Sequence, residues 1–299
     1  MNLFKTKSKC EMFVVFDEQQ KRQKITKTFR QKEKQLLIYT TGETVSGNLK
    51  IEIKDNSKID FEQITIEFLG QILIVGYDSY IFTQLSRQLE QKGSLSQSKT
   101  WEFSFPKVEK QFESYYGRIV TLRYFIKVTI EKKYGSNIRS EFDIFVMNKG
   151  HIKENGEPIL MEVGIQDCIH LQFEYTKSNF HLNDVLIGKV FYLLSRIKVN
   201  LMEISIIKRE IIGRGEEIEY HNEVVGKFEI MNGTPVKGES IPIRMFLENL
   251  DLTPTYRRIN NKFSVRYFVK LTLIDEENKK YFKQSEIFFY RTFLETMKL

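Results

Sequence analysis

Hydrophobic and polar residues alternate along most of the chain with a period of two, which is typical of β-strands. In residues 123–130 every even-numbered residue is apolar, whereas the odd-numbered residues include Arg123, Lys127 and Thr129. One apolar face and one amphipathic face describe a strand in a sheet that is buried on a single side. The same alternation predicts further strands at residues 50–53, 64–68, 101–105, 142–146, 170–173, 189–194, 203–207, 241–245 and 286–289.

A second copy of this pattern lies about half the chain further on. Residues 123–130, RYFIKVTI, return at an offset of 143 as residues 266–273, RYFVKLTL. Further echoes at offsets of 140 or 141 join Val45 to Val185, Gly47 to Gly188, and residues 64–66 to residues 204–206. This period is too long for a solenoid or a propeller blade, which repeat at roughly 20–50 residues. Many short strands in two similar halves predict an all-β protein of two tandem β-sandwich domains, at residues 1–150 and 151–299.

The boundary between the two domains is expected within the polar segment 147–160, where the alternation is interrupted. One short helix is expected in the first domain, over residues 81–90. Ile81, Leu85 and Leu89 fall there at i, i+4 and i+8, which would form a single apolar stripe on a helix.

Composition and charge limit the functional classes. The net charge is +7 and the pI is near 9.1, which suits a protein that works beside an anionic membrane surface. The start of the chain has no apolar signal segment, and no run approaches the roughly 18 apolar residues of a membrane span. Cys10 and Cys168 are too few for a disulfide framework, so reduced thiols and a cytoplasmic location are expected.

No arrangement of residues in the sequence predicts catalysis. The four histidines, at positions 151, 170, 181 and 221, do not pair at metal-ligand spacing, and no phosphate-binding loop or nucleophile motif is present. We therefore expect no catalytic residues, no metal and no cofactor. Arg123-Tyr124-Phe125 could indicate base stacking, but Tyr124 belongs to the apolar face, so core packing is preferred and nucleic-acid binding is not expected.

The second half carries the most specific strings of the sequence. They are Met161-Glu162-Val163-Gly164, Glu229-Ile230-Met231-Asn232-Gly233, Glu239-Ser240-Ile241-Pro242-Ile243-Arg244 and Tyr281-Phe282-Lys283-Gln284. The first half adds Gly42-Glu43-Thr44-Val45-Ser46-Gly47 and Ile66-Glu67-Phe68-Leu69-Gly70-Gln71. Together these strings closely resemble the arrestin-like subunit of retromer, the vacuolar protein sorting twenty-six family, over nearly the whole chain.

The resemblance implies two arrestin-like, immunoglobulin-type β-sandwich domains and a non-enzymatic role. In that family the subunit docks on the helical-solenoid subunit of retromer, and through it joins the metallophosphatase-like subunit. It is peripheral on endosomal membranes and contributes to the sorting of transmembrane cargo toward the Golgi or the plasma membrane.

The resemblance also implies two binding sites. The contact with the solenoid subunit would use Ile230, Met231, Asn232 and Gly233. An apolar pair before an Asn-Gly turn is costly to expose unless a partner covers it, and Met suits an irregular groove. The alternative is that one of the pair is a core residue at the end of a strand. The interface with cargo tails and a phosphoinositide-binding sorting nexin would use Val163 and Phe282, beside an exposed strand edge.

The sequence departs from the family pattern in three places. Thr41 replaces the acid that animal relatives use toward a PDZ-containing sorting nexin, which puts that partner in doubt. The first 35 residues match poorly, and the polar C-terminal tail of many relatives is shorter here. The alternatives are the related subunit of the retriever complex, another arrestin-type trafficking adaptor, and an enzyme with no recognisable motif.

Overall fold

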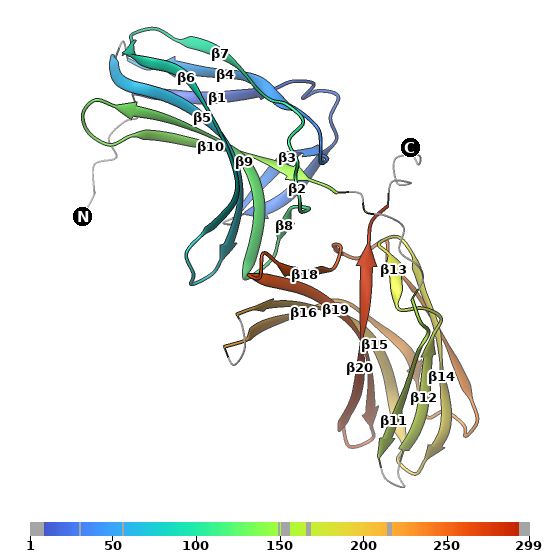
Figure 1. The fold of residues 1–299 in the computed structure, drawn as a ribbon. Coiled ribbons are helices and arrows are strands. Elements are labelled where there is room, and N and C mark those ends of the chain that lie inside the picture. Colours follow the sequence, from blue (N-terminus) through green and yellow to red (C-terminus); the bar gives the residue numbers. More distant parts are fainter. Residues whose placement is uncertain are drawn as a thin grey trace. The chain divides into compact units, whose positions relative to one another are not determined.

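The protein is all-β in the computed structural model, which describes residues 9–29, 31–55, 57–148, 150, 156–165, 169–213 and 217–292. The chain divides into two compact units, residues 1–148 and 149–299 (Figure 1). His151 and Cys168 lie outside the described residues.

The described residues of the first unit form ten strands in two sheets. The smaller sheet has the order β1-β4-β7, and the larger has the order β2-β3-β10-β9-β5-β6, with β8 paired to β9. The strands are β1 (Cys10–Phe16), β2 (Lys24–Phe29), β3 (Lys32–Tyr39), β4 (Val45–Ile53), β5 (Ile59–Ile74), β6 (Tyr80–Leu95), β7 (Lys99–Phe105), β8 (Tyr115–Tyr116), β9 (Val120–Lys132) and β10 (Ile138–Val146).

The described residues of the second unit repeat this plan, with one more strand in the smaller sheet and one fewer in the larger. That sheet has the order β11-β12-β14-β17, and the larger has the order β13-β20-β19-β15-β16, with β18 paired to β19. The strands are β11 (Ile159–Ile165), β12 (Ile169–Tyr175), β13 (Asn179–His181), β14 (Val185–Ser195), β15 (Val199–Ile212), β16 (Glu219–Asn232), β17 (Ser240–Phe246), β18 (Tyr256–Ile259), β19 (Phe263–Asp275) and β20 (Lys280–Tyr290).

The expected all-β fold is confirmed, because every strand predicted from alternation lies inside an observed strand. The repeated octapeptides occupy equivalent positions in β9 and β19. Tyr124 and Tyr267 are both fully buried, and each hydroxyl contacts the backbone of the preceding loop, at Phe112 and Thr253 respectively. The duplication therefore extends from the strand pattern to individual buried hydrogen bonds.

The helix expected at residues 81–90 is wrong, because this segment belongs to strand β6. Spacings of four and eight residues are even numbers, so Ile81, Leu85 and Leu89 fit one face of a strand as well as one stripe of a helix. Antiparallel pairing along nearly the whole of β5 decides between the two, and Ile81 and Leu85 remain exposed.

The expectation that β9 has only one buried face is also wrong. Arg123 and Phe125 on its second face are buried, and the Arg123 guanidinium donates to Asp143 at 2.8 Å and to Glu141 at 2.6 Å. The guanidinium also lies 5.1 Å from the centroid of the Phe29 ring, which comes from β2. Because these partners come from other parts of the chain, local alternation does not reveal that this face is covered.

Candidate partner-binding site

Strand β16 forms one edge of the larger sheet of the second unit, and β15 is the one described strand that pairs with it. Near its end, Glu229 pairs with Glu203 and Met231 pairs with Met202, so Ile230 has no partner residue and forms a β-bulge. A regular strand would bury one residue of the Ile230–Met231 pair and expose the other. The bulge instead leaves both side chains half-buried at the edge of the sheet.

A tight turn follows the bulge and fixes its position. Asn232 is exposed, and the Gly233 N–H donates to the carbonyl of Asn200 at 2.7 Å. Gly233 has a φ of 109°, which a residue with a side chain rarely adopts. The backbone therefore favours glycine at position 233, and this turn directly follows the apolar pair at the end of the strand.

The loop after this turn adds an apolar residue that the sequence analysis missed. Val236 is 73% exposed between β16 and β17. Its N–H donates to the Glu239 carboxylate at 2.8 Å, and the Gly238 N–H donates to the Tyr192 carbonyl at 2.7 Å. The loop is therefore tied to the sheet while its apolar side chain faces solvent. A valine in a Thr-Pro-Val-Lys loop carries no periodic signal, so only the structure locates it.

These residues can contact a partner but cannot catalyse a reaction. The tip offers apolar carbon and thioether groups beside exposed backbone. The nearest described ion pair on these strands joins Lys227 and Glu203 at 2.6 Å. Partly exposed apolar side chains at a strand end and in the loop that follows it are typical of a contact with another protein.

The two residues of the expected cargo site differ in solvent exposure. Val163 lies in the edge strand β11, opposite Leu171, and its side chain is buried in the core. Phe282 lies in β20 and is 60% exposed, with the Lys270 ammonium 4.1 Å from the centroid of its ring. The side chain of Val163 is therefore not available on the surface, whereas no strand of the described residues pairs with the outer backbone edge of β11.

Within the described part of the chain, strand β20 has a similar open edge over most of its length. β13 pairs with it only at residues 288–290, while β19 pairs with its other side from Lys280 to Ile287. Because β11 and β20 neighbour each other, the two unpaired edges and the exposed Phe282 lie on the same side of the sandwich. An extended peptide could add to either edge there.

The acidic residues 275–277 lie at the hairpin turn between β19 and β20. The Asp275 carboxylate accepts hydrogen bonds from the amides of Glu277 and Lys279, both at 2.9 Å, and from the Tyr281 hydroxyl at 2.9 Å. Although desolvation raises the pKa of Asp275, these hydrogen bonds lower it below its usual value. The carboxylate therefore organises the turn.

Within the described ranges, no three His, Cys, Asp or Glu side chains lie where they could share a metal ion. Burial raises the pKa of the Cys10 thiol, which makes it less reactive. No helix among the described residues is long and apolar enough to cross a membrane.

Comparison with known proteins decides the family. A model of the family described as Vacuolar protein sorting-associated protein 26 matches residues 6–278. The chain belongs to this family. The Dictyostelium discoideum protein of that name is 48% identical over 298 residues, which cover 97% of this chain and 85% of that protein. A Danio rerio relative, named Vacuolar protein sorting-associated protein 26B, is 45% identical and covers 97% of this chain and 89% of its own length.

The human Vacuolar protein sorting-associated protein 26B is 48% identical over 264 residues, or 87% of this chain. The resemblance recognised from the sequence is thus confirmed. The match to the family model includes Val163 and all of residues 230–233, whereas Phe282 lies just beyond its end.

Proposed function

We propose that the protein is the arrestin-like subunit of retromer and that it docks on the helical-solenoid subunit through the end of β16. Membership of the Vacuolar protein sorting-associated protein 26 family supports a role in vacuolar and endosomal protein sorting. The observation that carries the docking site is the bulge at Ile230, which presents two adjacent apolar side chains at one strand end.

The docking surface consists of Ile230, Met231 and Val236, held by the turn at Asn232 and Gly233. Burying these side chains in an apolar groove gains about 25 cal/mol for each Å² removed from water. Met231 has an unbranched, polarisable side chain that adapts to the irregular surface between two helices. The turn requires glycine at position 233 because of its φ of 109°, not because of limited space, since a Cβ there would meet nothing within 4 Å.

A second surface, the open edges of β11 and β20 with Phe282, takes an extended cargo tail together with a phosphoinositide-binding sorting nexin. Unpaired N–H and C=O groups of the two strands offer main-chain hydrogen bonds, which bind extended peptides with little dependence on their sequence. The exposed Phe282 ring, lying against Lys270, supplies an apolar contact that adds specificity.

Co-purification tests the proposed assembly. The tagged full chain, expressed in cells that contain the retromer subunits, should retain the helical-solenoid subunit and, through it, the metallophosphatase-like subunit. The Gly233→Val variant, which cannot adopt a φ of 109° without strain, should lose both partners together. Retention of neither subunit by the unaltered chain would rule out the proposed function.

A further inference from the structure

Among the residues that the structure describes, β4 pairs with one edge of strand β1 and no strand pairs with the other, and β1 carries apolar side chains on the outer face of its sheet. Cys10, Met12 and Phe16 point into the core. Phe13 and Val15 point outward and are 42% and 57% exposed. The outer face of a two-layer sandwich is normally polar, so two large apolar residues at its border need an explanation.

Natural proteins protect such edges, and β1 lacks the usual devices. Its register with β4 runs through all seven residues without a bulge, and it contains no proline. The one charged side chain, Glu11, forms an ion pair with Lys54. A straight, apolar edge with unpaired backbone groups favours the addition of another strand.

The second unit shows how this edge can be covered. Gly47 on β4 and Gly188 on β14 occupy equivalent positions. A Cβ on Gly47 would lie 2.3 Å from the carbonyl oxygen of Val15, and a Cβ on Gly188 would lie 2.4 Å from the carbonyl oxygen of Glu174. Strand β1 therefore corresponds to β12, with Val15 at the position of Glu174.

In the second unit β11 covers the edge of β12 in antiparallel fashion and places Leu160 opposite Glu174. The outward residues of the covered strand β12 are polar: His170, Gln172 and Glu174. In the part of the first unit that the structure describes, the smaller sheet has no strand in the place of β11, and the outward residues Phe13 and Val15 of β1 are apolar. The outward residues of the covered strand are thus all polar, whereas β1 has two apolar outward residues beside Glu11.

The surface beyond Val15 is acidic. Asp17 accepts a hydrogen bond from the Ser46 hydroxyl at 2.5 Å. Glu18 is the next residue in the chain, Glu102 lies on β7 of the same sheet as β1, and both are exposed. Among the described residues none of these three acids forms an ion pair.

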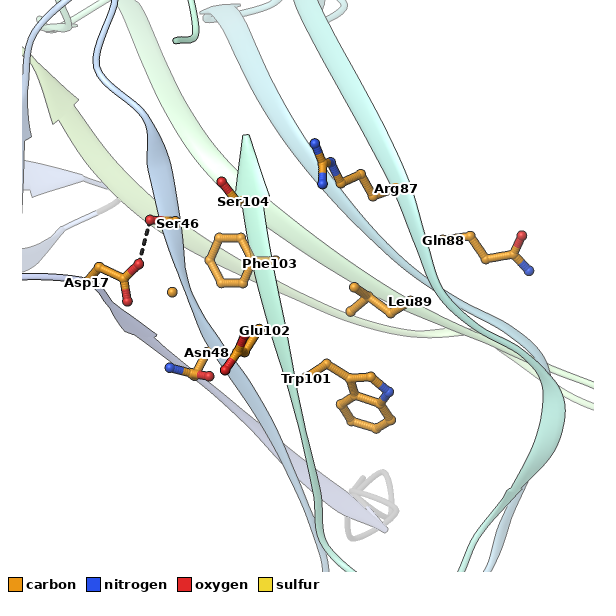
Figure 2. A pocket seen from close by; sticks show the side chains of 11 residues that line it. Asp17, Ser46, Asn48, Arg87, Gln88, Leu89, Trp101, Glu102, Phe103 and Ser104 are labelled. Atoms are coloured by element: carbon orange, nitrogen blue, oxygen red, sulfur yellow. Dashed lines mark hydrogen bonds between the residues drawn. The ribbon is translucent and has the colours of Figure 1, made fainter. Parts of the chain in front are cut away.

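A hollow of about 710 Å³ extends from Asp17 across β4 and β7 to β6 (Figure 2). Asp17, Asn48 and Glu102 line one end of it, and Arg87 and Trp101 lie at the other. At the end next to β1, the hollow favours a cationic side chain.

We propose that the edge of β1 binds an extended segment of a partner protein, which adds as an antiparallel strand in the place that β11 occupies in the second unit. If the bound segment keeps the register of β11, one of its apolar residues lies beside Val15, and a second, two positions later in the segment, lies beside Phe13. Two positions before the first apolar residue, a lysine or arginine lies beside Asp17 and enters the hollow. The recognised segment has the pattern basic-x-apolar-x-apolar. This surface does not depend on the proposed docking at β16.

A random peptide library tests the proposal on the full chain. Displayed peptides of about ten residues, long enough to span β1, are selected on the immobilised protein. The best binder is synthesised with a fluorescent label, and its affinity is measured by anisotropy. Enriched peptides should share the basic-x-apolar-x-apolar pattern.

The double variant Phe13→Thr/Val15→Thr keeps residues that favour strands, and should weaken binding by about tenfold or more. Asp17→Asn should weaken it about threefold and reduce its dependence on salt. The control Ile187→Thr changes an outward residue of an interior strand and should leave binding unchanged.

The fluorescence of Trp101, which lies in the same sheet as β1, verifies that each variant of the first unit is folded. Failure to enrich any peptide, or equal binding by the Phe13→Thr/Val15→Thr variant, would overturn the proposal. The proposal would also be overturned if the wild type sedimented as a dimer and the Phe13→Thr/Val15→Thr variant as a monomer, because a second copy of the chain would then cover β1.

Discussion

Replacing Lys110 by methionine should destabilise the first unit. Lys110 is fully buried, and its ammonium donates to the carbonyls of Thr40, Glu43 and Val108 at 3.1, 2.8 and 3.0 Å. These three bonds close the loop between β3 and β4 over the segment that follows β7. Lys110→Met preserves most of the volume and removes all three donors.

The expected loss is about 3 kcal/mol. Hydrogen bonds from a charged donor contribute roughly 1.5–3 kcal/mol each. Removing the ammonium also relieves the several kcal/mol that its desolvation costs, so the net effect is well below the sum of the three bonds. Two of the three carbonyls are only partly buried and can recover water, which limits the loss further.

Urea unfolding monitored by tryptophan fluorescence reports this loss directly. Trp101, the single tryptophan of the chain, lies in β7 of the first unit, so its signal follows that unit alone. With an m-value of roughly 2 kcal/mol/M, the midpoint should fall by about 1.5 M. Lys92→Met, at an exposed position, should shift the free energy of unfolding by less than about 0.5 kcal/mol. Equal midpoints for Lys110→Met and the wild type would refute the reasoning.

The pH dependence gives an independent check. Burial lowers the pKa of Lys110 to about 8, with the Glu43 carboxylate opposing the shift and Arg22 adding to it. An unfolded lysine titrates near 10.4, so between these values the unfolded state binds more protons than the folded state. The free energy of unfolding of the wild type, relative to Lys110→Met, should therefore rise as the pH increases from about 8 to about 10. A relative fall over this range would contradict the assignment.

Three further predictions concern the second unit and the whole chain. Tyr267→Phe removes the hydroxyl that accepts the Thr253 amide at 3.1 Å, and should cost about 1–2 kcal/mol in calorimetry and speed exchange of that amide. Hydrogen bonds from Lys279 and Tyr281 outweigh desolvation and lower the pKa of Asp275. The stability that the Asp275 carboxylate contributes should therefore be lost as the pH falls through that lowered pKa. In Asp275→Asn, the free energy of unfolding of the second unit should depend less steeply on pH in the acid range. The isolated chain, with its charge of +7, should bind anionic liposomes weakly and leave them in moderate salt; salt-resistant binding in flotation would contradict this.

Alternation in the sequence predicted the strands because each sandwich buries one face of most strands. It could not predict the order of the strands in each sheet, and so it did not show which edges stay open. The segment of β6 was misread as helix because its apolar spacing fits both periods. The buried second face of β9 was missed because Arg123 is covered by residues distant in the chain.

The candidate site shows the same limit. Ile230 and Met231 were selected by resemblance, but their shared exposure comes from a bulge that depends on the register with Met202 and Glu203. Val163 was expected on a binding surface, and its side chain is buried instead. Val236 has no pattern around it that distinguishes it from a loop residue.

Docking through the end of β16 is tested most directly by titration calorimetry of the full chain with the purified helical-solenoid subunit of retromer. The Ile230→Asp/Met231→Asp variant would place two carboxylates in an apolar groove, which costs several kcal/mol, so its affinity should fall at least about a hundredfold. Val224→Asp, at an exposed position on the same strand, should bind like the wild type, and both variants should keep the wild-type unfolding temperature of the second unit. Wild-type affinity in the folded double variant would contradict the account.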